Sequence, residues 1–259
     1  MTPASETAAS AVLDLPNGTR LHLGSPLFLS NARFTAREIF ERKEYEHPGF
    51  ELSTTDVVVD VGAHMGVFAH WAAPQIPQGR MVCVEPTAAA ERFEYSLAQN
   101  HWDHVTLHRV ALGRPSSTLE MIEHTTTAAL SRNAAFQIAL PFRIYLAWMK
   151  FRGRIVPTRR RTVPCWSLGE LLRHERIEEV DLLKMDCEGS EYEILAHTED
   201  GDLRRFRRIA MEYHLFHPTH RVETLVNRLQ KCGFEVQVSR KWFDFWFAKV
   251  GMLFATRRD

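Results

Sequence analysis

Hydrophobic positions along the chain fall into short β-branched runs separated by segments with helical spacing. The most pronounced run is 57–61, which is broken only by Asp60. A run of this kind suits a strand that is buried on both faces of a parallel sheet. It ends at the glycine-rich turn 62–66, after which Val67 and Trp71 have helical spacing. Strand, turn and helix form the first half of a βαβ unit, whose ligand binds at the carboxyl end of the strand.

Similar apolar runs predict six further strands after this turn. Helical spacing fills intervals between the early strands, whereas the last two have no obvious long helix between them. A parallel sheet finished by an antiparallel edge hairpin fits this order. We therefore predict an α/β fold with a Rossmann-like, seven-stranded, mostly parallel sheet and an antiparallel last strand. The six strands are 79–85, 105–110, one that begins at 180 and has acidic residues at its carboxyl end, 208–214, 234–238 and 251–256. The predicted helices are 88–100, 191–197 and 222–232.

Residues 1–55 are predicted to form an N-terminal extension that packs beside this fold. Within it, Pro16-Asn17-Gly18 separates two short apolar runs, and Asn-Gly is a strong hairpin signal. Residues 31–46 combine helical spacing with dense charge, so they predict a surface helix. The main domain is then 56–259, which carries an insert at about 121–162.

The composition is that of an ordinary globular protein, 45% hydrophobic and 25% charged, with 32 basic and 32 acidic residues. A net charge of zero gives no general electrostatic case for nucleic-acid binding. The four cysteines are scattered without C-x-x-C spacing, which predicts reduced thiols. The first residues lack the pattern of a signal peptide, and no apolar run reaches the ~18 residues of a spanning helix. We therefore expect a cytoplasmic protein.

The spacing of the glycines limits which ligand the first turn binds. The dinucleotide fingerprint G-x-G-x-x-G, started at Gly62, requires glycine where the chain has His64 and Val67. This weakens an NAD-binding interpretation without excluding it. The carboxylate of Asp60, two residues before Gly62, is ill suited to a diphosphate and well suited to a cationic ligand. S-adenosylmethionine (SAM), with its sulfonium and ammonium groups and no phosphate, is such a ligand.

Acidic residues close the second, fourth and fifth predicted strands. Glu85 follows Asp60 by 25 residues and ends its strand, where nucleotide folds bind ribose hydroxyls. Methyl transfer from a sulfonium needs an in-line acceptor, exclusion of water and removal of the acceptor's proton. Side chains at the other strand ends are candidates for these tasks. The predicted catalytic residues are Asp186, Glu188, Glu212 and His214.

Structural roles remain open for several of these side chains. Glu188 could accept hydrogen bonds from backbone amides in the turn at Gly189, and His214 could be a half-buried loop residue. Lys184, inside its strand, is expected to pair with an acid. An oxygen-rich cluster with one imidazole can also bind Mg²⁺. Because no metal motif of fixed spacing is present, we assign no metal ligand.

The insert after the third strand is basic and apolar, without an acidic residue between Glu123 and Glu170. Pro141 can open a helix, and residues 142–151 are apolar except for two basic side chains. A helix that is apolar nearly all round is buried in protein or in lipid. We interpret it as a lid on the core, with peripheral membrane contact through residues 141–161 as the alternative. The eight basic residues of the insert are Arg132, Arg143, Lys150, Arg152, Arg154, Arg159, Arg160 and Arg161.

Four of these motifs resemble those of the FkbM-type SAM-dependent O-methyltransferases. The resemblance covers roughly residues 35–120 and 163–256 and implies the class I methyltransferase fold, with SAM over strands one, two and four. The motifs are D-V-G-A-H-M-G at 60–66, V-E-P at 84–86, V-A-L-G at 110–113 and, most specific, L-L-K-M-D-C-E-G-S-E at 182–191.

The resemblance also implies roles for single residues. Asp60, Gly62 and Gly66 would form the loop beneath SAM, Glu85 would bind the ribose, and Asp186 would lie near the methyl group and the acceptor. At position 64 members of the family often have asparagine, whereas this chain has histidine. The remaining predicted cofactor contacts lie in the same motifs and are Ala63, His64, Pro86 and Ala111.

The sequence therefore predicts an enzyme that uses SAM to methylate a hydroxyl oxygen of a small-molecule, sugar or lipid-linked acceptor, without nucleic acid as a partner. An NAD-dependent Rossmann-fold oxidoreductase is one alternative. A catalytically silent SAM-fold module that binds a partner is another, which the full set of acids at the strand ends disfavours. The identity of the acceptor and the oligomeric state do not follow from the sequence.

Overall fold

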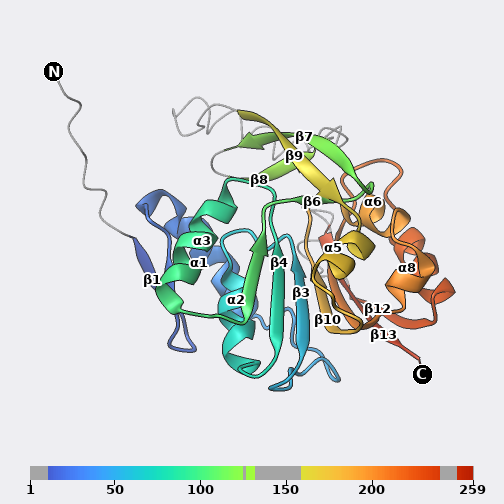
Figure 1. The fold of residues 1–259 in the computed structure, drawn as a ribbon, viewed down its shortest axis with the longest axis horizontal. Helices are drawn as coiled ribbons and strands as arrows, with labels where there is room; N and C mark the ends of the chain where they lie inside the picture. Colours follow the sequence, from blue (N-terminus) through green and yellow to red (C-terminus); the bar gives the residue numbers. More distant parts are fainter. Residues whose placement is uncertain (1–10, 125–126, 132–158, 240–249, 259) are drawn as a thin grey trace.

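A seven-stranded sheet runs through the centre of the molecule, with helices on both faces (Figure 1). The structure is a computed structural model and describes residues 11–124, 127–131, 159–239 and 250–258. The strands lie in the order β12-β13-β11-β10-β3-β4-β5. Their bounds are β3 Val57–Val61, β4 Arg80–Val84, β5 Val105–His108, β10 Val180–Met185, β11 Phe206–His214, β12 Phe234–Ser239 and β13 Val250–Arg257.

Five neighbouring strands of this sheet, from β5 through β4, β3 and β10 to β11, pair in parallel. β13 lies between β11 and β12 and runs antiparallel to both. The predicted Rossmann-like, seven-stranded sheet with an antiparallel last strand is confirmed. In this order β10, β3 and β4 are adjacent, so the ends of three predicted motifs meet at one edge of the sheet.

The two faces of β3 show why a continuous β-branched run forms this strand. Alternate side chains point to opposite faces, so Val59 and Val61 pack into one hydrophobic cluster and Val58 into the other. Helices cover both clusters, which removes the need for polar residues on either face. The first cluster contains residues of α5 Leu168–His174, α6 Glu191–Ala196, α7 Asp200–Leu203 and α8 Val222–Lys231, and the second contains residues of α2 Val67–Ala72, η3 Ala73–Gln75 and α3 Ala89–Asn100.

The N-terminal extension packs into the second cluster. β1 (Val12–Asp14) and β2 (Arg20–His22) form the predicted hairpin. The predicted end of the following helix at Glu46 is wrong, because the chain leaves the helix after Glu41 and Lys43 adopts a left-handed φ of 55°. The resulting turn brings Tyr45 into the interior, where it is 6% exposed. The helical segment consists of η1 Pro26–Phe28, α1 Leu29–Ala36 and η2 Arg37–Glu41.

A second sheet, with the strand order β6-β9-β7-β8, lies beyond the carboxyl ends of the central strands (Figure 1). The predicted third strand 105–110 is divided, because β5 ends at His108 and the chain then joins this second sheet. The described ends of the insert are strands, which were not predicted. The strands are β6 Ala111–Leu112, β7 Ser117–His124, β8 Thr127–Ser131 and β9 Arg159–Trp166.

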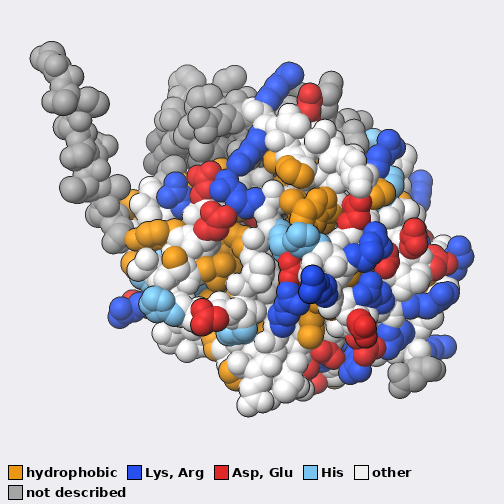
Figure 2. Space-filling model, viewed as in Figure 1, with side chains coloured by type: hydrophobic (Ala, Val, Ile, Leu, Met, Phe, Trp, Pro, Cys, Tyr) orange, Lys and Arg blue, Asp and Glu red, His pale blue; other side chains and the backbone are white. Residues whose placement is uncertain are grey.

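The predicted helix 142–151 lies outside the described residues, so the lid and membrane interpretations stay predictions. Across the described ranges, no helix is both long enough and apolar enough to span a bilayer. On the face shown in Figure 2, basic and acidic side chains are interspersed over the described surface, in keeping with the zero net charge.

His70 on α2 joins the extension to the central fold. Its ring is fully buried, with Nδ1 2.7 Å from the carbonyl oxygen of Gly66 and Nε2 2.9 Å from Ser96 Oγ. Ser96 Oγ in turn accepts a hydrogen bond from the backbone N–H of His22 in the hairpin. A neutral ring that carries its proton on Nδ1 fits these contacts, since Ser96 Oγ can then donate to Nε2. Burial lowers the pKa of His70 to about 4.

This histidine is expected to make the fold sensitive to acid. Below pH 6.5 the unfolded chain binds a proton at His70 that the folded chain does not bind until about pH 4. Stability from this group is therefore complete above pH 6.5 and falls as the pH drops toward 4, by roughly 3 kcal/mol in total. Urea unfolding at several pH values should show this slope, and His70→Asn should flatten it. An equal slope in both proteins would contradict the assignment, and the exposed His101→Asn serves as the matched control.

Candidate active site

The loop between β3 and α2 is held in a left-handed conformation at three positions. The φ angles are 79° at Gly62, 50° at His64 and 86° at Gly66. Glycine adopts this region freely and histidine is among the few other residues enriched there, so position 64 accepts a histidine. A Cβ on Gly62 would lie 1.8 Å from the backbone oxygen of Asp186, and one on Gly66 would lie 2.2 Å from the ring of Phe93. The loop is therefore pressed against the end of β10 and against α3.

Glu85, at the end of β4, ties this loop to the neighbouring strand. The residue is 4% exposed. Its Oε2 accepts a hydrogen bond of 2.8 Å from the backbone N–H of His64, and its Oε1 accepts one of 2.9 Å from Thr87. Each carboxylate oxygen can accept a further hydrogen bond. The side chain is thus fixed at the edge of the loop with capacity to bind hydroxyl groups.

Asp60 and Lys184 form a buried ion pair beneath the loop. The two residues are partners in the parallel register of β3 and β10, so their side chains leave the same face of the sheet. Lys184 Nζ lies 2.9 Å from Asp60 Oδ1 and donates a 3.0 Å hydrogen bond to the carbonyl oxygen of Gly62. The side chains are 4% and 0% exposed. The expected pairing of Lys184 with an acid is confirmed.

The pKa shifts of this pair oppose each other. Burial raises the pKa of Asp60 against the effect of Lys184. Burial alone would lower the pKa of Lys184, but the carboxylates of Asp60 and Asp186 raise it. Because Nζ contacts both a carboxylate and a carbonyl oxygen, we infer that the charged pair persists at neutral pH.

His214 is surrounded by carboxylates at the end of β11. Its Nδ1 lies 2.9 Å from Glu191 Oε1, and its Nε2 lies 3.8 Å from Glu188 Oε2 and 3.9 Å from Asp186 Oδ1. The side chain is 4% exposed. His214 is therefore a buried strand residue and not the half-buried loop residue considered from the sequence. The structure brings together the predicted residues Asp186, Glu188, Glu212 and His214.

Burial and charge set the protonation of this cluster. Burial alone would lower the pKa of His214, but Glu191 first and then Glu188 and Glu212 raise it well above its usual value. Burial and the neighbouring carboxylates raise the pKa of Glu188, whereas His214 lowers it. The Glu188 side chain is 38% exposed, so water limits the rise of its pKa. The raised pKa of His214 favours its protonated form, and the raised pKa of Glu188 makes its carboxylate a better proton acceptor than an exposed one.

Glu191 has a larger part in this site than its predicted place at the start of a helix indicates. Its Oε1 accepts hydrogen bonds from the backbone N–H groups of Cys187 and Gly189. It thus takes the role in the Gly189 turn that was considered for Glu188. The residue is 0% exposed, and it holds the turn and the imidazole of His214 with one oxygen.

Tyr45, in the turn after the N-terminal helix, was not predicted as a site residue. Its ring lies 5.9 Å from Lys184 Nζ and packs edge-on against Phe68. Burial raises the pKa of Tyr45, followed by the charges of Asp186 and Glu212. The N-terminal extension therefore reaches the same acids as the strand ends. The sequence did not indicate this residue, because position 45 falls within the predicted surface helix 31–46.

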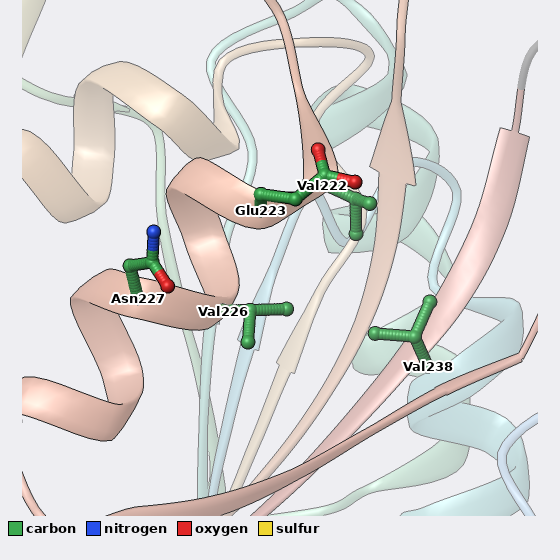
Figure 3. Close-up of a pocket in the computed structure, with 5 residues that line it drawn as sticks. All are labelled: Val222, Glu223, Val226, Asn227 and Val238. Carbon is green, nitrogen blue, oxygen red and sulfur yellow. The ribbon is translucent and has the colours of Figure 1, made fainter.

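The other predicted residues are spread along this edge. Ala63 is buried beside the glycines, and Pro86 is half-buried after Glu85. Ala111 lies in β6, where it pairs with β9 and packs with Met121 and Val163 in the second sheet. A pocket between α8 and β12 is separate from this edge, because none of the predicted site residues lines it (Figure 3). Its lining residues are Val222, Glu223, Val226, Asn227 and Val238.

The described residues contain two groups that could hold a metal ion. One is Asp186, Glu212 and His214, whose ligand atoms lie within 4.8 Å of one another. The other is His108, His174 and Glu175. In that group the Glu175 carboxylate is already engaged by both His108 and Arg80. The first group alone lies at the edge where the glycine loop and Glu85 meet.

Comparison with known proteins identifies a matching family. The family model for the methyltransferase FkbM domain matches residues 60–236. The 31-O-demethyl-FK506 methyltransferase FkbM of Streptomyces tacrolimicus is 29% identical, over 78% of this chain and 81% of its own length.

Two further matches differ in how much of the related protein they cover. The AMB antimetabolite synthetase AmbE of Pseudomonas aeruginosa is 26% identical over 92% of this chain, but the chain spans only 12% of that protein. Among solved structures, precorrin-6y C5,15-methyltransferase of Geobacter metallireducens aligns with a TM-score of 0.45 and 14% identity, over 98% of this chain and 96% of that chain.

Proposed function

Because this chain belongs to the FkbM methyltransferase family, we propose that it transfers a methyl group from SAM to a hydroxyl oxygen of a small-molecule, sugar or lipid-linked acceptor. The observation that carries the proposal is the meeting of four strand ends at one edge. They carry the glycine loop after β3, Glu85 after β4, the acids after β10, and Glu212 and His214 at the end of β11.

The residues at this edge fit SAM. Because Gly62 and Gly66 have no Cβ, their loop can lie close against Asp186 and Phe93. Glu85 is buried, fixed by two backbone N–H groups and able to accept hydrogen bonds from ribose hydroxyls. The carboxylates around Asp186 suit a cationic ligand better than a diphosphate. Bound SAM would supply the methyl group on an electrophilic sulfonium.

The chain's own residues would position the acceptor and accept its proton. Asp186 lies just beyond β10, and its backbone carbonyl lies next to Gly62 of the proposed cofactor loop. Glu188, whose pKa is raised by burial, can accept the acceptor's proton, and His214 Nε2 lies 3.8 Å from its carboxylate. A base whose pKa lies near the working pH transfers protons most efficiently. Tyr45 from the extension would help to exclude water, since its buried ring packs on Phe68 beside Lys184.

We expect SAM and S-adenosylhomocysteine to stabilise the protein and NADH not to. A ligand at a hundredfold excess over Kd adds about 2.7 kcal/mol of stability, which a thermal-shift assay detects. Glu85→Ala should lose most of the shift, because the proposed ribose contact is removed. Glu94→Ala, an exposed acid on α3, is the matched control and should keep it. Stabilisation by NADH but not by S-adenosylhomocysteine would overturn the proposal.

A further inference from the structure

We propose that Asp186, Glu212 and His214 bind a divalent cation of the Mn²⁺ or Mg²⁺ type, with Glu191 holding the imidazole in position. This inference deepens the proposed function, because the ion would lie beside the methyl acceptor. The sequence alone assigned no metal ligand among these residues.

The backbone places the three side chains on one side of the sheet. Glu212 and His214 are two positions apart in β11, so their side chains leave the same face. In the parallel register of β10 and β11, Lys184 pairs with Ala210 and Met185 with Met211. The next position along each strand therefore places Asp186 beside Glu212. One ligand atom from each residue lies within 4.8 Å of the others. Mg²⁺ ligands lie about 2.0–2.1 Å from the ion, so opposite ligands are roughly 4 Å apart, which small side-chain rotations provide here.

The environment of His214 is an independent indication of an ion. Metal-binding histidines almost always donate their second ring N–H to a carboxylate or carbonyl oxygen. Here Nδ1 lies 2.9 Å from Glu191 Oε1, in a carboxylate that is 0% exposed and fixed by two backbone N–H groups. This leaves Nε2 aimed at Asp186 and Glu188. Both acids lie beyond hydrogen-bond distance at 3.9 and 3.8 Å, and Nε2 has no hydrogen bond within the described part of the chain.

The balance of charge favours a cation at the same point. Four carboxylates, those of Asp186, Glu188, Glu191 and Glu212, surround one imidazole. Lys184 is engaged by Asp60 and Gly62 at the base of the site. Carboxylates gathered at one partly buried site repel one another, and a divalent cation among them would reduce this repulsion.

The ligand set narrows the kind of ion. Two carboxylates with one imidazole suit Mn²⁺ or Mg²⁺ better than ions that prefer thiolates. Calcium sites use six to eight oxygen ligands and no imidazole. The ion would keep open positions for water or for the acceptor hydroxyl, whose pKa it would lower.

The test is a titration of the purified protein with Mn²⁺ at pH 8, in which binding is measured as the loss of the EPR signal of free Mn²⁺. We expect one ion per chain. Glu212→Gln should weaken binding at least tenfold, because it removes a charged ligand. Glu191→Gln should weaken it by roughly 10–100-fold, as loss of the group that orients a histidine ligand does. Glu178→Gln, an exposed acid at the opposite end of β10, should bind like the wild type.

Binding of S-adenosylhomocysteine, measured by calorimetry in the same samples, shows that each variant is folded and separates the two proposals. If the homocysteine derivative binds and Mn²⁺ does not, the metal site is refuted and the methyltransferase proposal stands. If Mn²⁺ binds and the derivative does not, the metal site stands and the cofactor assignment fails. Equal Mn²⁺ affinity in the wild type and Glu212→Gln would also overturn the metal site.

Discussion

Replacing Lys184 with methionine is expected to lower the free energy of unfolding by about 3–5 kcal/mol. The variant leaves Asp60 buried without its partner, in a position that is 0% exposed. It also removes the hydrogen bond to the carbonyl oxygen of Gly62, so the loop proposed to bind SAM loses an anchor. Urea unfolding at pH 7 measures the loss. Binding of S-adenosylhomocysteine should weaken in parallel.

The double variant Lys184→Met/Asp60→Asn shows whether the unpaired charge causes the loss. Asparagine keeps the shape of Asp60 without its charge, so the double variant should be more stable than Lys184→Met alone. If the two are equally unstable, the hydrogen bond to Gly62 and not the ion pair is the dominant interaction.

Asp186→Asn is expected to cut methyl transfer by roughly 10²–10⁴-fold, the range typical for loss of a group that assists proton transfer. The amide keeps the size of the side chain, and the backbone oxygen that faces Gly62 is unchanged. Affinity for S-adenosylhomocysteine should therefore change far less than turnover. Turnover is measured as release of S-adenosylhomocysteine with a hydroxylated acceptor that a screen of the wild type has identified.

The matched control for this variant is Asp103→Asn, an exposed aspartate after α3. It should turn over like the wild type. If Asp186→Asn and Glu212→Gln both keep wild-type turnover, the acids at the ends of β10 and β11 do not take part in the reaction.

The central sheet could be predicted because its signals are local. The run 57–61 is buried on both faces, and the turn at Gly62 follows it directly. The pairing of Lys184 was also predictable in kind, since a charged residue inside a buried strand needs a partner. Its identity as the partner of Asp60 depends on the register of two strands far apart in sequence.

Other parts of the site depend on contacts that no local pattern encodes. Tyr45 reaches the acids only because the chain leaves its helix five residues earlier than the pattern of charge and apolar spacing predicts. Glu191 is an acid in the first turn of a helix, which is a common position for one. Only the fold shows that its carboxylate lies against His214. β7 and β9 pair across a long insert, so neither strand could be placed from its neighbours in sequence.

The position of β3 between β4 and β10 has a consequence for how the chain folds as it is made. Lys184 and the Gly62 carbonyl that it contacts are 122 positions apart. At a synthesis rate of about 5–20 residues per second, the nascent chain exposes one edge of β3 for roughly 6–24 seconds before its partner emerges. During that interval Asp60 lacks its partner Lys184, and the glycine loop lacks its contact with the end of β10. The binding site therefore forms late in synthesis. Until then the early βα units expose the unpaired edge of an apolar strand, to which chaperones can bind.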